Sequence, residues 1–352
     1  MLTRGGDTAW TSRLRVYAAL AVVAIHVGSS TAKLSPGSLD WIVATLTDAA
    51  CRWCVPIFFM VSGYFLLDPA KTETLSVFYR KRASRLLAPI VFWSIFYTAF
   101  TYYTKPGLTV GDLVYSLLVG MPAEHLWYLF AICGLYAFTP FLRMVMATTT
   151  SSQRWVLVTL LFAIPIGDGL WGLLQSARAV RLATAPPSFL TLFVPYLGYY
   201  VCGYQIRTTR GDRISDAILW LAAAGSILAI FVANMLLTRI GVGKDHLYGY
   251  LFGYLSPPVI LMSLAIFLLA ARHGPRRSQG SPLLARVAKM EPATLGIYII
   301  HPVVISILGL CGVRSSMWPA PVSIPVLTVV VFVLSYAATQ LIRKVPYLRT
   351  TV

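Results

Sequence analysis

Residues 13–31 read RLRVYAALAVVAIHVGSST, and this stretch decides the fold because ten uncharged residues separate Arg15 from His26. A helix needs about 20 apolar residues to cross the hydrocarbon core of a bilayer. At about 100° per residue, eleven steps bring Arg15 and His26 back to one face of such a helix, about 16 Å apart along its axis. The stretch therefore predicts a membrane-spanning helix with a cation and an imidazole on one face.

The composition of the 352-residue chain extends this reading to the whole protein. Hydrophobic residues make up 57% of the chain and charged residues 12%, whereas an ordinary globular domain carries about 25% charged residues. Too few polar side chains remain to cover a surface in water. The composition excludes a disordered chain, a disulfide-rich secreted protein and a cytosolic enzyme. It predicts an all-α polytopic membrane protein with a single domain over residues 1–352.

Apolar runs along the chain predict a bundle of about ten membrane-spanning helices. The first is expected to stay attached as an uncleaved span, the second to be interrupted at Pro56, and residues 107–122 to form a short re-entrant or surface helix. The ten predicted spans cover residues 13–31, 42–67, 86–103, 125–146, 155–174, 187–206, 214–238, 247–271, 293–312 and 322–342.

The basic residues predict the orientation of this bundle. The chain has 29 Lys and Arg against 12 Asp and Glu, a net charge of +17. With the amino terminus in the cytoplasm, 21 basic residues fall in cytoplasmic segments and 7 in external ones. This bias follows the positive-inside rule and places both termini in the cytoplasm. Because topology accounts for most of the positive charge, we expect no nucleic-acid partner.

Titratable side chains at membrane depth are costly and therefore mark candidate functional positions. His26 lies past the middle of the first span, His301 lies near the middle of the ninth, and His125 begins the fourth beside Trp127. The alternatives are structural: a snorkelling Arg15, hydrogen-bonded buried histidines, and an aromatic belt around His125. We expect Arg15 and the three histidines to form the catalytic group.

Two further segments could contact substrates. Arg52 lies inside the second span and needs a partner there, for which Asp48, one turn earlier, is a candidate. Ser62 and Tyr64 follow in the same span, although their Ser-Gly-Tyr segment equally suits close helix packing. Cys51 and Cys54 form an isolated C-x-x-C without a second ligand pair, so we expect them to pack and expect no metal site.

A third segment is basic and cytoplasmic. Arg82 and Arg85 are one helical turn apart and share a face, which suits a phosphate group. The alternative is a stop-transfer cluster that only fixes topology.

Five blocks in this order resemble the acyltransferase-3 family of integral membrane acyltransferases, and they span most of the chain outside residues 150–290. The blocks are Leu14-Arg15-x10-His26, Arg52-x2-Val-Pro-Ile-Phe-Phe-Met-x-Ser-Gly-Tyr64, Arg82-x2-Arg85 before Leu-Leu-x-Pro89, His125-Leu-Trp-Tyr-Leu129, and Leu295-Gly-Ile-Tyr-x2-His301-Pro302. Many relatives place an Asp shortly before the Leu-Arg of the first block. Here Ser12 and Arg13 occupy that stretch, and the nearest acid is Asp7.

The resemblance is closest to the bacterial branch that O-acetylates surface polysaccharides and their lipid-linked precursors. It implies a multi-pass protein of the bacterial inner membrane that uses acetyl-CoA as a co-substrate, with no tightly bound cofactor, and a carbohydrate or lipid-linked glycan as acceptor. Membrane lipids surround such a protein; its oligomeric state does not follow from the sequence. The expected substrate contacts are Arg82, Arg85, Arg52, Ser62, Tyr64 and Trp127.

Two other functions fit the composition. A polysaccharide polymerase or ligase would also be polytopic and basic, but it usually carries a large external loop, and no external segment here exceeds about 20 residues. A transporter or flippase of lipid-linked sugars would also use buried His and Arg, but internal repeats would be expected and none is found. The histidines fall in the middle to outer half of the membrane, so we expect donor and acceptor to approach from opposite sides.

Overall fold

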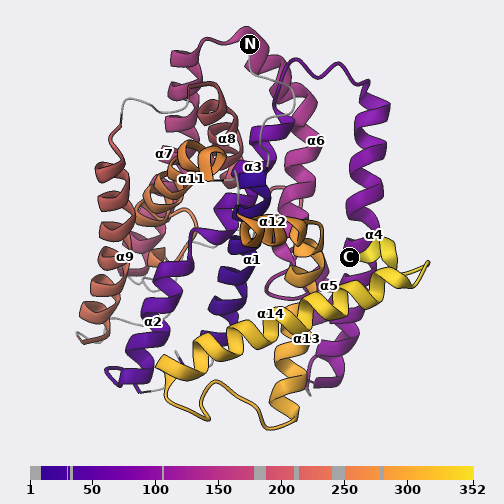
Figure 1. Ribbon diagram of the computed structural model, residues 1–352, viewed down its shortest axis with the longest axis vertical. Coiled ribbons are helices and arrows are strands. Elements are labelled where there is room, and N and C mark those ends of the chain that lie inside the picture. Colours follow the sequence, from indigo (N-terminus) through magenta and orange to yellow (C-terminus); the bar gives the residue numbers. More distant parts are fainter. Residues whose placement is uncertain are drawn as a thin grey trace.

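The computed structural model describes residues 9–29, 31, 35–104, 107–177, 188–209, 214–239, 250–277 and 281–352, and every regular element in these ranges is a helix. Figure 1 shows them as one bundle in which α14 crosses the front obliquely. The long helices are α1 (Ala9–Gly28), α2 (Leu39–Cys51), α3 (Cys54–Leu66), α4 (Leu75–Thr104), α6 (Trp127–Thr148), α7 (Ser151–Ala177), α8 (Leu197–Thr209), α9 (Asp216–Arg239), α11 (Pro257–Arg277), α13 (Thr294–Leu310) and α14 (Ala320–Lys344). The short ones are α5 (Val110–Leu118), α12 (Pro282–Lys289), η2 (Val194–Tyr196), η3 (Glu291–Ala293) and η4 (Arg349–Thr351).

Eight helical segments in the described residues are long and apolar enough to cross a membrane. They correspond to eight of the ten predicted spans, with α2 and α3 together forming the second. The other two predicted spans are α1 and α8. α1 contains two arginines, and α8, with 13 residues, is about 20 Å long at 1.5 Å per residue. The protein is therefore an all-helical, multi-pass membrane protein.

Where Figure 1 shows the connections, successive spans run in opposite directions, with α2 and α3 counted as one span. The connections α3–α4 and α6–α7 lie at the top of Figure 1, whereas the start of α2 and the connection α13–α14 lie at the bottom. This alternation is the arrangement that the predicted order of spans requires.

The second predicted span is broken at Arg52 and Trp53, between α2 and α3, and not at Pro56 as predicted. Pro56 instead lies in the first turn of α3. A helix's first N–H groups have no partner within the helix, so a proline costs little there. The predicted break is therefore three to four residues too late along the chain.

Other boundaries also differ from the predicted ones, and α4 begins at Leu75, eleven residues before the predicted third span. The α-helical part of the sixth span begins only at Leu197, and that of the eighth at Pro257; residues 187 and 247–249 lie outside the described residues. A proline favours the first helical turn, which fits the start of α11. Within 107–122, only Val110–Leu118 is helical, it opens with a capping box between Thr109 and Asp112, and none of its residues is buried.

Glycines bring two helices of the core into backbone contact. A Cβ atom added at Gly63 in α3 would lie 1.8 Å from the carbonyl oxygen of Tyr200 in α8, and one added at Gly203 would lie 2.0 Å from that of Met60. No side chain fits at either position. This contact shows that Gly63 serves close packing, and it fixes α3, which carries Ser62, inside the bundle.

Candidate active site

Three histidines from three distant parts of the chain meet inside the bundle. The ring centroids of His26 and His301 are 4.9 Å apart, those of His125 and His301 are 5.6 Å apart, and those of His26 and His125 are 6.5 Å apart. His26 comes from α1 and His301 from α13, while His125 lies two residues before α6. The sequence predicted each of these residues as a candidate, and the fold brings them together into one group, which we call the histidine cluster.

The backbone around His301 determines which of its ring nitrogens carries a proton. Nδ1 lies 3.2 Å from the carbonyl oxygen of Ile297. Because a carbonyl oxygen only accepts, Nδ1 must be the donor. Pro302 has no N–H for the carbonyl one turn earlier, that of Tyr298, and the His301 ring also interacts with this freed group. His301 is fully buried, and its Nε2 has no hydrogen-bond partner in the described residues.

His125 is held by the same turn of α13. Its Nε2 donates to the carbonyl of Ile299 at 3.2 Å, and the hydroxyl of Tyr97 donates to that oxygen at 2.6 Å. The hydroxyl of Tyr298 donates in turn to the carbonyl of His125. These contacts leave Nδ1 of His125 as the nitrogen without a proton in the neutral ring. His125 is 4% exposed, so its orientation is set by protein groups and not by water.

His26 differs from the other two histidines because the residue as a whole is half-buried, whereas His125 and His301 are buried. The charges that act on it come chiefly from Arg52, Glu124 and Asp48. No hydrogen bond from a protein group restrains its ring in the described residues. His26 is therefore the member of the cluster with the most freedom to meet a substrate.

A cavity of about 780 Å³ lies beside the histidine cluster, and we call it the cationic cavity. Helices α1, α3, α4, α6 and α13 supply its walls, together with the carboxyl-terminal segment. Tyr298 forms part of the wall, and its ring centroid is 5.7 Å from that of His125 and 6.2 Å from that of His301. One tyrosine ring thus separates the cavity from the cluster. The lining includes six cationic residues, Arg15, Lys71, Arg82, Arg85, Arg343 and Arg349, and one acidic side chain, Glu291.

Arg15 has a carboxylate partner that the sequence analysis missed. Its guanidinium pairs with the carboxylate of Glu291 in η3, 276 positions later in the chain. Both side chains are about one quarter exposed, at 27% and 25%. Glu291 thus provides the acid that the stretch around Ser12 lacks; Asp7 lies outside the described residues. The feature of the sequence that could have indicated this pairing is Glu291 itself, an acidic residue that closely follows the basic residues ending at Lys289.

The two predicted phosphate-binding arginines both line the cavity. The Arg82 guanidinium lies over the rings of Phe78 and Tyr136, at 5.4 and 5.6 Å from their centroids, and its buried Nε has no hydrogen-bond partner in the described part of the chain. Arg85 is exposed at the rim. Burial, and then Arg143 and Arg82, lower the pKa of the Lys71 ammonium. The positive charges near the mouth of the cavity thus add to the effect of burial on this pKa.

The remaining predicted substrate contacts are distributed over different places. Ser62 lines the cavity and is buried. Tyr64, two residues later, is not part of the lining and packs edge-on against Trp10, with 5.5 Å between ring centroids. Two residues correspond to about 200° of helical rotation, so Ser62 and Tyr64 cannot share a cavity wall. Trp127 also lies outside the lining and packs against Tyr196 at 5.0 Å.

Arg52 lies at the break between α2 and α3, outside the lining of the cationic cavity. It binds the carboxylate of Asp48 at 2.6 Å, as the sequence analysis suggested, and lies over the rings of Phe252 and Tyr254. The neighbouring Cys51 and Cys54 are free thiols. Within the described ranges, no three His, Cys, Asp or Glu side chains are grouped in a way that would hold a metal ion.

Comparison with known proteins agrees with this architecture. A family model described as an acyltransferase domain matches residues 9–340. The chain is also similar to a protein named serine/alanine racemase from Enterococcus gallinarum, with 28% identity over 313 residues, which cover 84% of this chain and 40% of that relative. It thus spans about two fifths of the relative's length, and no solved structure matches it. The chain belongs to the acyltransferase-3 family of membrane acyltransferases.

Proposed function

We propose that this protein transfers an acetyl group from cytoplasmic acetyl-CoA to a hydroxyl group of a surface polysaccharide or its lipid-linked precursor, in a bacterial inner membrane. The observation that carries the proposal is the contact between two unlike regions. A cavity lined by six cations ends at Tyr298, and the histidine cluster lies directly behind that ring. An acyltransferase with an anionic donor needs both regions side by side.

The cationic cavity suits the donor. Acetyl-CoA carries several phosphate groups, and guanidinium groups bind phosphate through paired, charge-assisted hydrogen bonds. Arg82 and Arg85 would hold the phosphates from α4, with Arg343 and Arg349 facing them in the same lining. The volume of about 780 Å³ lies within the usual range for small-molecule sites. The thioester at the end of the flexible arm would then lie near Ser62 and Tyr298.

The histidine cluster suits the acceptor step. A sugar hydroxyl is a weak acid, so it needs a base as it attacks, and a neutral imidazole is suited to this role. In the proposed step the hydroxyl oxygen attacks the thioester carbonyl and its proton passes to His26. The C–S bond then breaks, and the CoA thiolate leaves and takes up a proton. Ser62, which lines the cavity, would donate to the oxyanion that forms transiently on the thioester.

The remaining two histidines would act around this base. The unprotonated Nε2 of buried His301 faces no other partner in the described residues, and its ring is the nearest to that of His26. It can accept a hydrogen bond from the protonated ring of His26, which returns to its neutral form when its proton passes to the leaving CoA thiolate. His125 fixes the turn of α13 that presents His301.

The proposed access routes are on opposite sides of the membrane, in a bundle of about ten spans with both termini in the cytoplasm. His26 keeps exposed surface although it does not line the cationic cavity. It also lies toward the end of α1 that is remote from Arg15. Both observations support an acceptor that reaches His26 from outside, as an outward-facing glycan.

Sealed proteoliposomes of known orientation test this proposal. Radiolabelled acetyl-CoA is supplied on the side that carries the basic loops, and a membrane-impermeant oligosaccharide acceptor is supplied on one side at a time. We expect labelled oligosaccharide only when donor and acceptor are on opposite sides. Labelling only with both substrates on the donor side would overturn the two-sided model. If acetyl-CoA is neither consumed nor bound, while lipid-linked sugar crosses the bilayer, the protein is a flippase.

The racemase name of the relative does not lead us to a racemase proposal. The matched region covers 40% of that relative. The remaining, larger part of the relative is not matched by this chain. Its named activity belongs to the whole protein. Acyl transfer is therefore the function that the family and the site support together.

A further inference from the structure

A second cavity, of about 550 Å³, lies between α1, α9, α11 and α12, and we call it the lateral cavity. It shares no lining residue with the cationic cavity. α1 separates the two cavities, because Arg13 lines the lateral one and Arg15 the cationic one. A spacing of two positions corresponds to about 200° of helical rotation. The proposed acyl transfer assigns no role to the lateral cavity.

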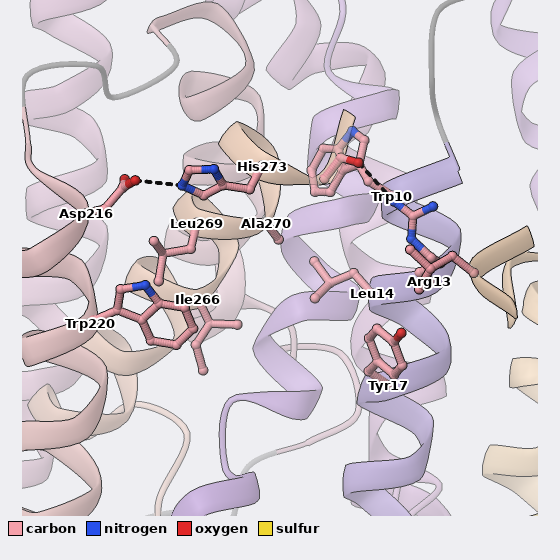
Figure 2. A pocket seen from close by; sticks show the side chains of 12 residues that line it. Trp10, Arg13, Leu14, Tyr17, Asp216, Trp220, Ile266, Leu269, Ala270 and His273 are labelled. Atoms are coloured by element: carbon pink, nitrogen blue, oxygen red, sulfur yellow. Dashed lines mark hydrogen bonds and ion pairs between the residues drawn. The ribbon is translucent and has the colours of Figure 1, made fainter. Parts of the chain in front are cut away.

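The lateral cavity is divided into a charged end and an apolar end. In the view of Figure 2, Asp216 and His273 are joined above the side chains of Leu269, Trp220 and Ile266. The His273 Nε2 lies 2.7 Å from the Asp216 carboxylate, and Arg272 binds the same carboxylate at 2.8 Å. On the other wall, the Arg13 guanidinium donates to the carbonyl of Gly274 at 2.9 Å.

The charged end lies where the helices leave the bundle. Asp216 is the first residue of α9, Trp10 is the second residue of α1, and His273 is in the last turns of α11. Tyr17 marks the other end of the α1 wall, seven residues after Trp10 and about 10 Å deeper. Trp and Tyr favour the interface between water and lipid. The lateral cavity therefore extends from this interface into the hydrocarbon region.

We propose that the lateral cavity binds an anionic glycerophospholipid. One acyl chain would lie along Trp220, Ile266 and Leu269, and the phosphate would sit at the charged end, between Arg13 and His273. Trp220 is 62% exposed and Tyr17 is 43% exposed, so the cavity is open to the side where lipid surrounds the bundle. Arg13 and Asp216 line the charged end, and Arg272 pairs with Asp216 beside it. These three side chains carry one net positive charge even with a neutral His273, which favours an anionic headgroup.

The lipid would hold α1 in place from the side opposite the donor. Trp10, at the rim, packs tightly on α11: a Cβ atom at Gly274 would lie 2.4 Å from the Cβ of Trp10. α1 also carries Arg15 and His26, which face the proposed reaction path. Occupancy of the lateral cavity therefore stabilises the helix that connects the cationic cavity with the histidine cluster.

Native mass spectrometry of the purified, delipidated protein tests this proposal without an activity assay. The probes are phosphatidylglycerol, phosphatidylethanolamine and diacylglycerol with identical acyl chains. We expect phosphatidylglycerol to be retained most strongly, and Arg13→Gln to reduce its retention about tenfold, because a charge-assisted contact is lost. Arg286→Gln removes an exposed charge from α12 that does not line the cavity, and it is expected to retain the lipid as the wild type does.

A second variant covers the case in which Arg13→Gln fails to fold. Ala270→Phe places a ring in the apolar part of the cavity and leaves the charged end intact. We expect it to reduce the retention of all three lipids and to remove the rise in melting temperature that added phosphatidylglycerol gives the wild type. Equal retention of diacylglycerol and phosphatidylglycerol would overturn the proposal. So would unchanged retention in Ala270→Phe, or a preference for a polyprenyl phosphate that displaces phosphatidylglycerol.

Discussion

The histidine cluster and the cationic cavity are neighbours that are built in opposite ways. In the cluster, backbone carbonyls fix two of three rings, and His301 and His125 are almost without exposed surface. In the cavity, long side chains from several helices surround an open space, and Arg85 at its rim is exposed. The His301 and His125 rings are thus held in place by the backbone, whereas the cavity is adaptable and depends on summed charge.

This contrast has a physical reason. A proton transfer requires heavy atoms within hydrogen-bond distance in one geometry, so its groups must be fixed. Several phosphates on a flexible ligand can be bound in more than one way by mobile cations, and each cation then contributes only part of the affinity. Loss of one residue should therefore be far more damaging in the cluster than at the rim of the cavity.

The largest effect is expected for His26. His26→Ala removes the proposed base, and we expect acetyl transfer to fall about 10²–10⁴-fold. The measurement is the initial rate of label transfer in proteoliposomes, with protein amount and monodispersity matched to the wild type. His26→Gln is the matched control for packing and hydrogen bonding, because an amide fills similar space but is not a base. Near-normal transfer in a well-folded His26→Gln protein would remove His26 from the chemistry.

An intermediate effect is expected where the two regions meet on α1. Arg15→Gln removes a cation of the cavity and its pair with Glu291, and we expect kcat/KM for acetyl-CoA to fall about tenfold to a hundredfold. Glu291→Gln keeps an acceptor for the Arg15 guanidinium and leaves its charge available to the donor, so we expect a smaller loss. If Glu291→Gln is as damaging as Arg15→Gln, the pair is structural and Arg15 does not bind the donor.

A smaller effect is expected at the rim. Arg85→Ala should raise the KM for acetyl-CoA about threefold to tenfold and leave kcat unchanged, because other cations still hold the phosphates. Arg80→Ala is the matched control, since Arg80 is exposed on the same helix and does not line the cavity. Reporter fusions after α4 check the orientation of both variants. An inverted α4, or equal KM values in the two variants, would favour a purely topological role for Arg85.

The sequence predicted the parts of the site that depend on a single helix. Spacing alone put Arg15 and His26 on one face of α1, and depth in an apolar run singled out His301. His125 was singled out as the start of a span beside Trp127. The same reasoning was less successful where rotation around a helix matters. Tyr64 was grouped with Ser62 because both belong to one motif, yet a rotation of about 200° between them directs Tyr64 toward Trp10.

Contacts between residues far apart in the sequence could not be predicted from the pattern of a single helix. The pairing of Arg15 with Glu291 joins residues 276 positions apart, and Arg343 and Arg349 were counted only as topological charges although they line the cavity. Hydropathy also gave span boundaries without resolving the break at Arg52, because a run of apolar residues has no marker where two short helices meet. Packing between distant segments determines these features, and the sequence of one segment does not contain it.

The smallest expected effect concerns stability at the mouth of the cavity. Burial alone would raise the pKa of Glu73, but its hydrogen bonds to Arg143 and Lys81, each at 3.1 Å, outweigh this, so its pKa is lowered. A carboxyl group with a lowered pKa in the folded state stabilises the protein above the pKa of the unfolded state. That stabilisation is lost as the pH falls through the lowered value. Glu73→Gln should therefore cost less than about 1 kcal/mol at pH 7, since Lys81 is exposed.

The difference between wild type and Glu73→Gln should shrink as the pH falls below about 4.5, because the wild-type carboxyl group then becomes neutral as well. Thermal unfolding in detergent at a series of pH values between 7 and 3 measures it. Asp112→Asn is the matched control: in the part of the chain that the structure describes, Asp112 is hydrogen-bonded within the cap of α5, away from the cavity. A gap that persists unchanged at pH 3 would show that the glutamine substitution perturbs packing and that the Glu73 ion pairs do not stabilise the rim.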